Sequence, residues 1–266
     1  MRLFDTHAHY WDERFKNELG EGGTDALLDR LLTGEVPHIV NVGTSPATSR
    51  LAISQAARHP GMLTAVGIHP TDCQRLSDAD AALSEIETLL LDPASRAVAL
   101  GEIGLDYHYE DTEKEKQLFF FREQLAMAER LSMPVSVHDR DAHGDVLKTL
   151  TAFPGVRGIL HSYSGSAESA RELIEAGYYI SFSGTVTFKN AARVRAVAAA
   201  LPPERILIET DCPYLCPDPY RGTLNHSGRL PLILSALAEL YGMSTEALGA
   251  QLYRNSLRAF SLPPED

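Results

Sequence analysis

The chain has 266 residues, of which 44% are hydrophobic and 23% charged, so it can fill a large core and is not an intrinsically disordered chain. Its 24 basic and 36 acidic residues give a formal net charge of −12, which opposes diffuse attraction to nucleic acid. A polyanionic substrate must therefore be held locally, and bound dications are one source of local positive charge.

Eight short runs rich in apolar and β-branched residues alternate with helical patterns. The runs are Leu3–Thr6, His38–Val42, Leu63–Ile68, Ala97–Gly101, Val135–Val137, Gly158–Leu160, Tyr178–Phe182 and Arg205–Thr210. The helical patterns are Thr24–Leu32, Ala47–Arg58, Asp78–Leu91, Glu113–Leu131, Ala142–Leu150, Ala167–Glu175 and Asn190–Leu201, with a last region from Leu230 to Phe260. This alternation is typical of βα units, and the count of eight predicts a single (β/α)₈ TIM-type barrel over residues 1–266. An open doubly wound sheet has the same alternation and remains an alternative.

The three cysteines, Cys73, Cys212 and Cys216, are too few for a disulfide framework and fit a reducing compartment. Cys212 and Cys216 have the spacing of half a zinc site, but no second pair exists, so buried free thiols are favoured. The chain reaches Asp5 before an apolar signal segment can form, and no stretch approaches the roughly 20 apolar residues of a membrane span. We therefore expect a cytoplasmic protein without membrane contact.

The potential metal ligands share one position in the pattern, because each stands at or just after the end of a predicted strand. They are His7, His9, His69, Glu102, His138, His161, Glu209 and Asp211. Active sites of TIM barrels lie at the C-terminal ends of the strands, so we expect these side chains to converge there.

Each of these residues alone has an ordinary alternative. His7 and His9 could be a solvated pair, although in extended backbone their rings point to one side. A single His138 or His161 is commonly a hydrogen-bonded core histidine, and Glu102 could be an exposed turn residue. The joint pattern favours a metal site, because none of these alternatives predicts convergence on one rim.

Imidazole and carboxylate ligands suit zinc, manganese, iron or nickel better than calcium, and magnesium also stays open. The set is large enough for two divalent ions that share a carboxylate, and such a pair activates water for hydrolysis. Asp211 is the predicted catalytic base, and Glu102 is the second predicted catalytic carboxylate. No Gly-x-Ser-x-Gly elbow or glycine-rich phosphate loop competes with this interpretation.

The motifs together resemble the TatD family of metal-dependent deoxyribonucleases, within the amidohydrolase-like barrels. The matching pieces are Asp5-Thr6-His7-Ala8-His9, Gly67-Ile68-His69-Pro70, Gly101-Glu102-Ile103-Gly104-Leu105-Asp106-Tyr107, His138-Asp139-Arg140-Asp141, His161-Ser162-Tyr163-Ser164-Gly165 and Glu209-Thr210-Asp211-Cys212-Pro213.

The resemblance implies a ligand set and an activity. His7, His9, Glu102 and Asp211 would bind one ion, and Glu102 would bridge to a second ion held by His138 and His161. Glu209 would lie near the metals and serve a third ion, and His69 and Arg140 would hold a phosphate. Asp5, Asp106 and Tyr107 would support these residues. The implied activity is 3′–5′ exonuclease removal of nucleotides from DNA, commonly from single-stranded ends.

One loop departs from the family's pattern. After Arg221-Gly222 relatives often read Arg-Gly-x-x-Asn-Glu-Pro, whereas this chain has His226-Ser227 after Asn225. We expect the loop to cover the pocket, so the change bears on substrate choice.

Two other functions are compatible with the sequence. One is metal-dependent hydrolysis of a small-molecule amide, ester or phosphoester, because a fold does not fix a function. The other is a non-catalytic metal-binding protein. Tyr107, Tyr109, Tyr163 and Tyr214 are candidates for base stacking or for ordinary packing. We expect a monomer.

Overall fold

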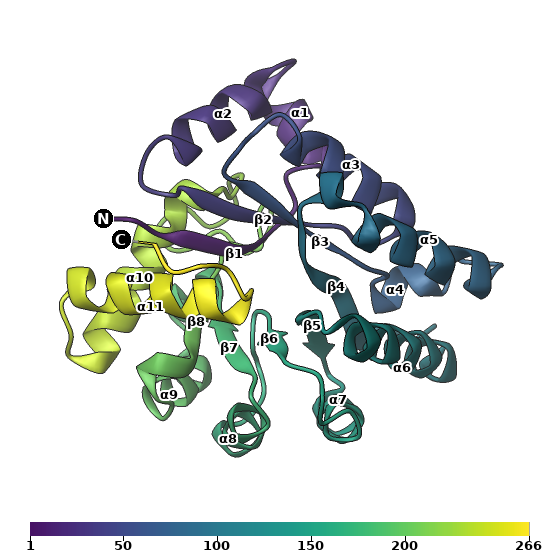
Figure 1. Cartoon of the computed structure of the whole chain (residues 1–266). Coiled ribbons are helices and arrows are strands. Elements are labelled where there is room, and N and C mark those ends of the chain that lie inside the picture. The colour runs from purple at the N-terminus through teal and green to yellow at the C-terminus, as the bar shows by residue number, and fades with distance from the viewer. Residues whose placement is uncertain (266) are drawn as a thin grey trace.

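The computed structural model describes residues 1–265 and contains an eight-stranded parallel sheet whose strand order follows the chain. The strands are β1 (Phe4–Ala8), β2 (His38–Val42), β3 (Met62–Val66), β4 (Ala97–Asp106), β5 (Val135–Arg140), β6 (Gly158–Leu160), β7 (Tyr179–Phe182) and β8 (Ile206–Ile208). Each strand pairs with the next, from β1 with β2 to β7 with β8. The strands lie in the middle of the molecule with the helices around them (Figure 1).

The sheet closes on itself just beyond β8. Ala8 forms a parallel bridge with Cys212, the His9 N–H donates to the Cys212 carbonyl (2.7 Å), and the Asp211 N–H donates to the His7 carbonyl (2.9 Å). The predicted TIM-type barrel is therefore confirmed. The seam between its first and last strands lies beside three of the predicted metal ligands, His7, His9 and Asp211, because their own backbone groups make the closing bonds.

The helices lie in the connections between the strands. They are α1 (Glu13–Leu19), α2 (Gly23–Leu32), α3 (Pro46–Ala56), α4 (Pro70–Cys73), α5 (Ala79–Leu91), α6 (Lys114–Leu131), α7 (His143–Thr151), α8 (Ala167–Glu175), α9 (Ala192–Ala199), α10 (Leu230–Tyr241) and α11 (Thr245–Ala259). Short 3₁₀ turns are η1 (Pro93–Ser95), η2 (Gly184–Thr187), η3 (Pro203–Arg205) and η4 (Ser227–Arg229). Side-chain oxygens of Asp12, Ser45 and Ser166 cap α1, α3 and α8. None of the helices within residues 1–265 is long and apolar enough to cross a membrane.

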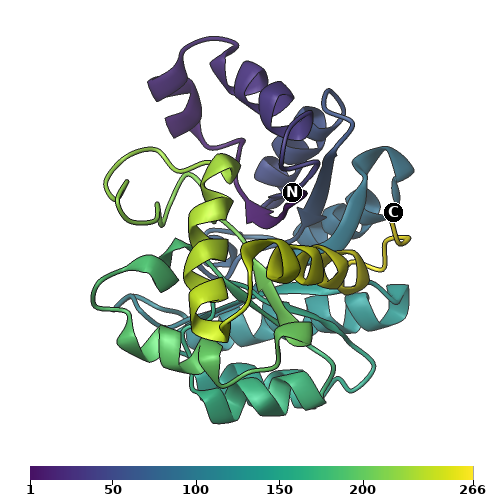
Figure 2. The ribbon, with the colours of Figure 1, turned by 90° about the vertical axis from the view of Figure 1, so that its left-hand side faces the viewer.

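Nearly every strand residue is buried, because the inner face fills the barrel and the outer face packs against helices. One polar group inside the barrel, the Thr6 hydroxyl, donates to the Ile208 carbonyl (3.0 Å). Glu265 pairs with Arg2 and with His38 (2.8 Å) at the N-terminal ends of β1 and β2. The last two helices, α10 and α11, cross one another on the outside of the barrel (Figure 2).

Several boundaries differ from the sequence-based expectation. β4 extends to Asp106 and β5 to Arg140, beyond the predicted ends at Gly101 and Val137, so Glu102 and His138 lie within strands rather than after them. Both extensions pair with each other through Asp106 and Arg140, and this pairing is a tertiary effect that local composition does not reveal. The short helices α1 and α4 were not predicted.

Candidate metal centre

The predicted ligands converge at the C-terminal ends of the strands. His7 lies in β1 and His9 just after it, Glu102 in β4, and His138 in β5. His161 follows β6 directly, and Asp211 follows β8 with a left-handed backbone (φ 54°), which aspartate tolerates better than most residues. His69 is the N-cap residue of α4.

Glu102 stands at the centre of this group, and its two oxygens face different histidines. Oε2 lies 3.4 Å from His7 Nε2 and 3.6 Å from His9 Nε2. Oε1 lies 2.9 Å from both His138 Nδ1 and His161 Nε2. The Glu102 side chain is only 4% exposed, so it faces these nitrogens rather than water.

The first group of ligand atoms comes from the barrel seam. His7 Nε2 and His9 Nε2 lie 3.1 Å apart, and Asp211 Oδ1 is 3.8 and 3.4 Å from them. Ligands at about 2.0–2.1 Å from a tetrahedral ion lie about 3.3 Å from one another, so this group could hold one divalent ion. The other ring nitrogens are fixed, His9 Nδ1 by the Val42 carbonyl (2.8 Å) and His7 Nδ1 by Ser136 Oγ (3.3 Å).

The second group lies on the other side of Glu102. His138 Nδ1 and His161 Nε2 are 3.1 Å apart, and each ring has a carboxylate at its far nitrogen. His138 Nε2 faces Asp106 Oδ2 (3.1 Å), and His161 Nδ1 faces Glu209 Oε1 (3.2 Å). Such carboxylate–histidine contacts orient metal-binding rings and make them more basic, so this group could also hold an ion.

Glu209 lies behind His161 and is fully buried. Its Oε1 also accepts the Ser162 N–H (2.7 Å), while its Oε2 has no hydrogen-bond partner among the described residues. The structure therefore gives Glu209 an orienting contact with His161. Direct metal binding by Glu209 stays a prediction.

The two predicted phosphate-holding residues line the same cavity. The Thr71 N–H donates to His69 Nδ1 (3.2 Å), so in a neutral ring the hydrogen is on Nε2, which lies 3.4 Å from Glu102 Oε1. Arg140 is exposed at the end of β5, with its guanidinium 5.6 Å from the Tyr109 ring. Both can therefore donate hydrogen bonds into the cavity.

Mutual charges set the protonation of these groups. Burial alone raises the pKa of the Glu102 carboxyl, but His69, His161 and His7 outweigh burial and hold this pKa well below its usual range. Burial also opposes ionisation of Asp211, and the hydrogen bond from His9 with the charges of His161 and His7 lowers its pKa. Burial lowers the pKa of His69 to about 3. At neutral pH the two carboxylates are ionised and His69 is neutral.

The candidate centre opens into two cavities. The larger, about 680 Å³, contains polar residues from the loops after β1 to β5, including Thr44, Thr71 and Arg75. The smaller, about 420 Å³, extends past Tyr163, Val194 and Leu215. His138, Arg140, His161, Asp211 and Tyr214 line both, so the two cavities meet at the candidate ligands.

Trp11, the chain's single tryptophan, also lines the larger cavity, although no sequence motif points to it. Its indole N–H donates to the Val42 carbonyl (2.7 Å), and its ring meets His9 edge-on at 5.7 Å. The contacts fix the ring beside a candidate ligand. The only available signal was its position two residues after His9, which suits a buried aromatic equally well.

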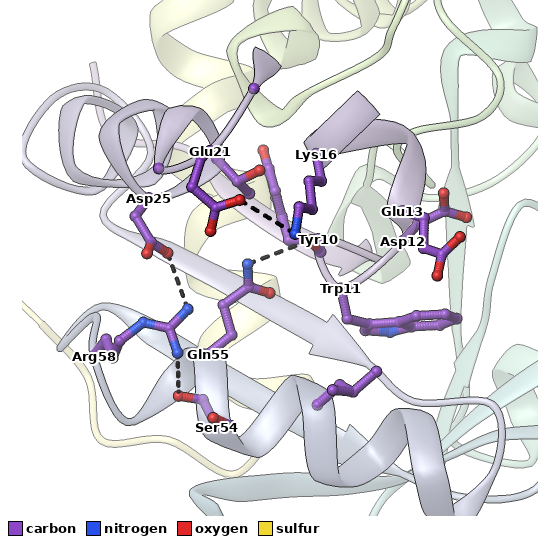
Figure 3. Close-up of a pocket in the computed structure, with 14 residues that line it drawn as sticks. Tyr10, Trp11, Asp12, Glu13, Lys16, Glu21, Asp25, Ser54, Gln55 and Arg58 are labelled. Carbon is purple, nitrogen blue, oxygen red and sulfur yellow. Dashed lines mark hydrogen bonds and ion pairs between the residues drawn. The ribbon is translucent and has the colours of Figure 1, made fainter. Parts of the chain in front are cut away.

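A shallow groove of about 290 Å³ between α1, α2 and α3 shares Trp11 and Asp12 with the larger cavity (Figure 3). Its cations are already paired, Lys16 with Glu21 (3.2 Å) and Arg58 with Asp25 (3.1 Å), as the dashed lines in Figure 3 show. This groove therefore offers no free cation to a charged ligand.

The divergent loop does not cover the candidate centre as expected. Tyr214 and Leu215 line the cavities, whereas residues 221–226 line neither. The physical reason is Asn225, whose buried amide donates to the carbonyls of Thr210 (2.9 Å) and Tyr214 (2.7 Å) and so ties the loop down beside β8. The His226 side chain accepts the Gly228 N–H (3.2 Å) as the N-cap of η4.

The remaining predicted residues have ordinary contacts. Asp5 accepts bonds from the Thr210 N–H (2.9 Å) and hydroxyl (2.5 Å), which supports the seam. Tyr107 donates to Asp145 (2.9 Å), and the candidate ligand groups within residues 1–265 include no cysteine. The three cysteines are free and buried, as expected.

The sequence matches the family described as TatD related DNase over residues 4–261. The chain belongs to the TatD family. It is 36% identical to the uncharacterized metal-dependent hydrolase YabD of Bacillus subtilis, over 98% of this chain and 99% of the relative. It is 35% identical to the uncharacterized metal-dependent hydrolase TatD of Mycobacterium tuberculosis, over 89% and 90% of the two chains. The crystal structure of YjjV, a TatD homologue from Escherichia coli, superimposes with a TM-score of 0.89 at 28% identity, over 98% of this chain and 99% of that one. Membership of the TatD family makes the chain a metal-dependent hydrolase.

Proposed function

We propose that the chain is a two-metal phosphodiesterase that removes nucleotides from single-stranded DNA ends, with 3′–5′ polarity. The observation that carries this proposal is the position of Glu102, whose two oxygens face two separate groups of imidazole nitrogens. A carboxylate placed in this way suits a bridging ligand between two ions. The family described as TatD related DNase supports DNA as the substrate.

In this proposal His7, His9, Glu102 and Asp211 hold one ion, and Glu102, His138 and His161 hold the second. Glu209 orients His161 or serves a third ion. Zinc, manganese, magnesium, nickel and iron are all compatible with the donor set. When bound, such ions supply positive charge to a phosphoryl oxygen and promote the ionisation of a water.

The chain's own residues would then position the phosphate and take a proton. Asp211 is ionised at neutral pH and lies where the two cavities meet, so it can accept the proton of an attacking water. His69 Nε2 and the Arg140 guanidinium can donate to phosphate oxygens. Trp11, Tyr109 and Tyr214 offer stacking surfaces along the same cavity, and base stacking contributes about 1–3 kcal/mol per base.

The first experiment is cleavage of 3′- and 5′-labelled single-stranded DNA with magnesium, manganese and zinc supplied separately. We expect stepwise shortening from the 3′ end, lost in Asp211→Asn. Trp11→Ala should raise the KM for DNA about tenfold, the effect of one lost stacking contact, and leave the hydrolysis of a small phosphodiester unchanged. Absence of cleavage by metal-loaded protein would reject the DNA assignment.

A small-molecule amide, ester or phosphoester is the second candidate substrate. Its support is the larger cavity, whose volume of about 680 Å³ lies within the usual range of small-ligand pockets. Activity on small substrates that is insensitive to Trp11→Ala, without DNA cleavage, would favour it. We further propose a cytoplasmic, monomeric, single-domain protein. Size-exclusion chromatography can test the oligomeric state, limited proteolysis the domain organisation, and cell fractionation the location.

A further inference from the structure

A cavity of about 410 Å³ lies at the N-terminal ends of the strands, at the opposite end of the barrel from the metal centre. Pro134, just before β5, and Gly158 and Tyr179, which open β6 and β7, form part of its wall. The four residues from Pro134 to His138 place it about 13 Å along the strand direction from the nearest candidate ligand. The cavity is therefore separate from the proposed active site.

Three arginines line this cavity: Arg157, Arg205 and Arg258. No aspartate or glutamate is among its lining residues, although the chain has 36 acidic residues and a net charge of −12. One carboxylate lies at its edge, where Glu129 packs against Gly155. Positive charge is thus concentrated here in an otherwise acidic protein.

The arginines' contacts leave most of their donors free. The Arg157 guanidinium donates to the carbonyls of Pro154 (2.6 Å) and Val156 (2.8 Å), and the Arg205 guanidinium lies over the Tyr179 ring at 5.1 Å. None of the ion pairs among residues 1–265 involves the three arginines, and Arg258 makes no side-chain hydrogen bond with these residues either. In the groove of Figure 3, by contrast, the cations have carboxylate partners.

The ordinary alternative is that arginine stems cover the floor of the barrel, and that Arg258 interacts with the C-terminal carbonyls of α11. This alternative accounts for Arg157, which binds loop carbonyls. It gives no reason why three arginines line one cavity that has no carboxylate among its lining residues.

We propose that this cavity binds a small phosphate-bearing anion, either free phosphate or the phosphate of a nucleotide. Guanidinium groups match phosphate oxygens with paired N–H donors and remain charged at every physiological pH. The volume suits a small ligand and not a polymer. Gly177, with φ +97°, packs against the Arg157 side chain and helps to hold it in place, since a Cβ there would lie 2.3 Å from Arg157 Cδ. The site does not depend on the proposed nuclease function.

Isothermal titration calorimetry of the metal-loaded protein tests this site, with inorganic phosphate and a nucleoside monophosphate titrated separately at constant ionic strength. Phosphate can also bind the metals. Binding at the cavity is therefore identified as the binding event that the arginine variants lose. We expect Arg205→Gln/Arg258→Gln to weaken one event at least tenfold and to leave hydrolysis unchanged. Arg258→Gln alone, a change at an exposed side chain, should weaken it less, and Glu129→Gln should strengthen it.

Arg122→Gln is the matched control, because Arg122 is an exposed arginine on α6, away from the cavity. Tighter binding of the nucleotide than of phosphate would identify a nucleotide site, and equal or weaker binding a free-phosphate site. Identical titrations of the wild type and the double variant would overturn the proposal. Thermal unfolding gives a second test. If the double variant is less stable than the wild type by the same amount with and without phosphate, the arginines only cap the helix, and the proposal is overturned.

Discussion

The two ends of the same eight strands are built differently. At the C-terminal end, the buried His7 ring lies within 4 Å of two carboxylates, those of Glu102 (3.4 Å) and Asp211 (3.8 Å). At the N-terminal end, Gly158 packs so closely on β5 that a Cβ would lie 2.1 Å from the Val135 carbonyl oxygen. Around His7 the C-terminal end therefore holds mutually dependent charges, whereas at Gly158 the N-terminal end depends on steric fit. Substitutions should change chemistry at the first end and stability at the second.

Of the substitutions that test this comparison, Glu102→Ala should have the largest effect, and it should act on metal content and hydrolysis. It removes the carboxylate that both histidine groups face, so metal content should fall and hydrolysis should decrease on the order of a thousandfold. The fold should persist, because the deleted side chain contacts histidines rather than the apolar core. Metal analysis, circular dichroism and hydrolysis rates measured together test this expectation. A fully active variant would remove Glu102 from the site.

Gly158→Ala should lower stability and leave the chemistry unchanged. The added methyl group meets backbone that cannot rotate away, so the free energy of unfolding should fall by about 3 kcal/mol. Hydrolysis per folded molecule should stay unchanged. Gly144→Ala on α7 is the matched control, because nothing lies within 4 Å of its Cβ position and alanine favours a helix by about 0.5–1 kcal/mol. Equal denaturation midpoints of the two variants would contradict this view of the N-terminal end.

Glu209→Gln tests whether Glu209 binds a metal ion itself or only orients His161. Glutamine can still accept the Ser162 N–H but removes the charge behind His161, so metal affinity and activity should fall about 10- to 100-fold. Unchanged metal stoichiometry would identify an orienting residue, whereas the loss of one bound ion would identify a ligand. Glu172→Gln, an exposed change on α8, is the control.

The sequence predicted which side chains converge, because the C-terminal ends of parallel strands meet at one rim. It did not predict that Glu102 lies inside a strand, since the extension of β4 depends on pairing with β5. The Val42 carbonyl that fixes His9 and Trp11 was also invisible, because a backbone group has no side-chain signature.

The divergent loop shows a second limit. Its departure from the family's pattern at His226 indicated an effect on the pocket, yet Asn225 decides where the loop lies. Such a contact joins residues that are 11 and 15 positions apart in a segment without regular structure, so no periodicity predicts it.

The smallest expected effect is on the pH dependence of stability, and it comes from His226, an imidazole outside the candidate metal centre. Burial, with the charges of Arg229 and Arg30, lowers its pKa to about 4. The unfolded chain therefore binds more protons between about pH 6.5 and pH 4, so this group makes the protein less stable as the pH falls through that window. Because the ring is partly exposed, we expect a loss of about 1 kcal/mol rather than the full value of the shift.

His226→Asn keeps an N-cap side chain for η4 and removes the titration. Unfolding free energies of both proteins at about pH 7 and about pH 4.5 should show that the wild type loses about 1 kcal/mol more than the variant. Parallel losses would mean that His226 is protonated equally in the folded and unfolded chains. In that case the low pKa values at this end of the barrel would be confined to the metal centre, where carboxylates and histidines face one another directly.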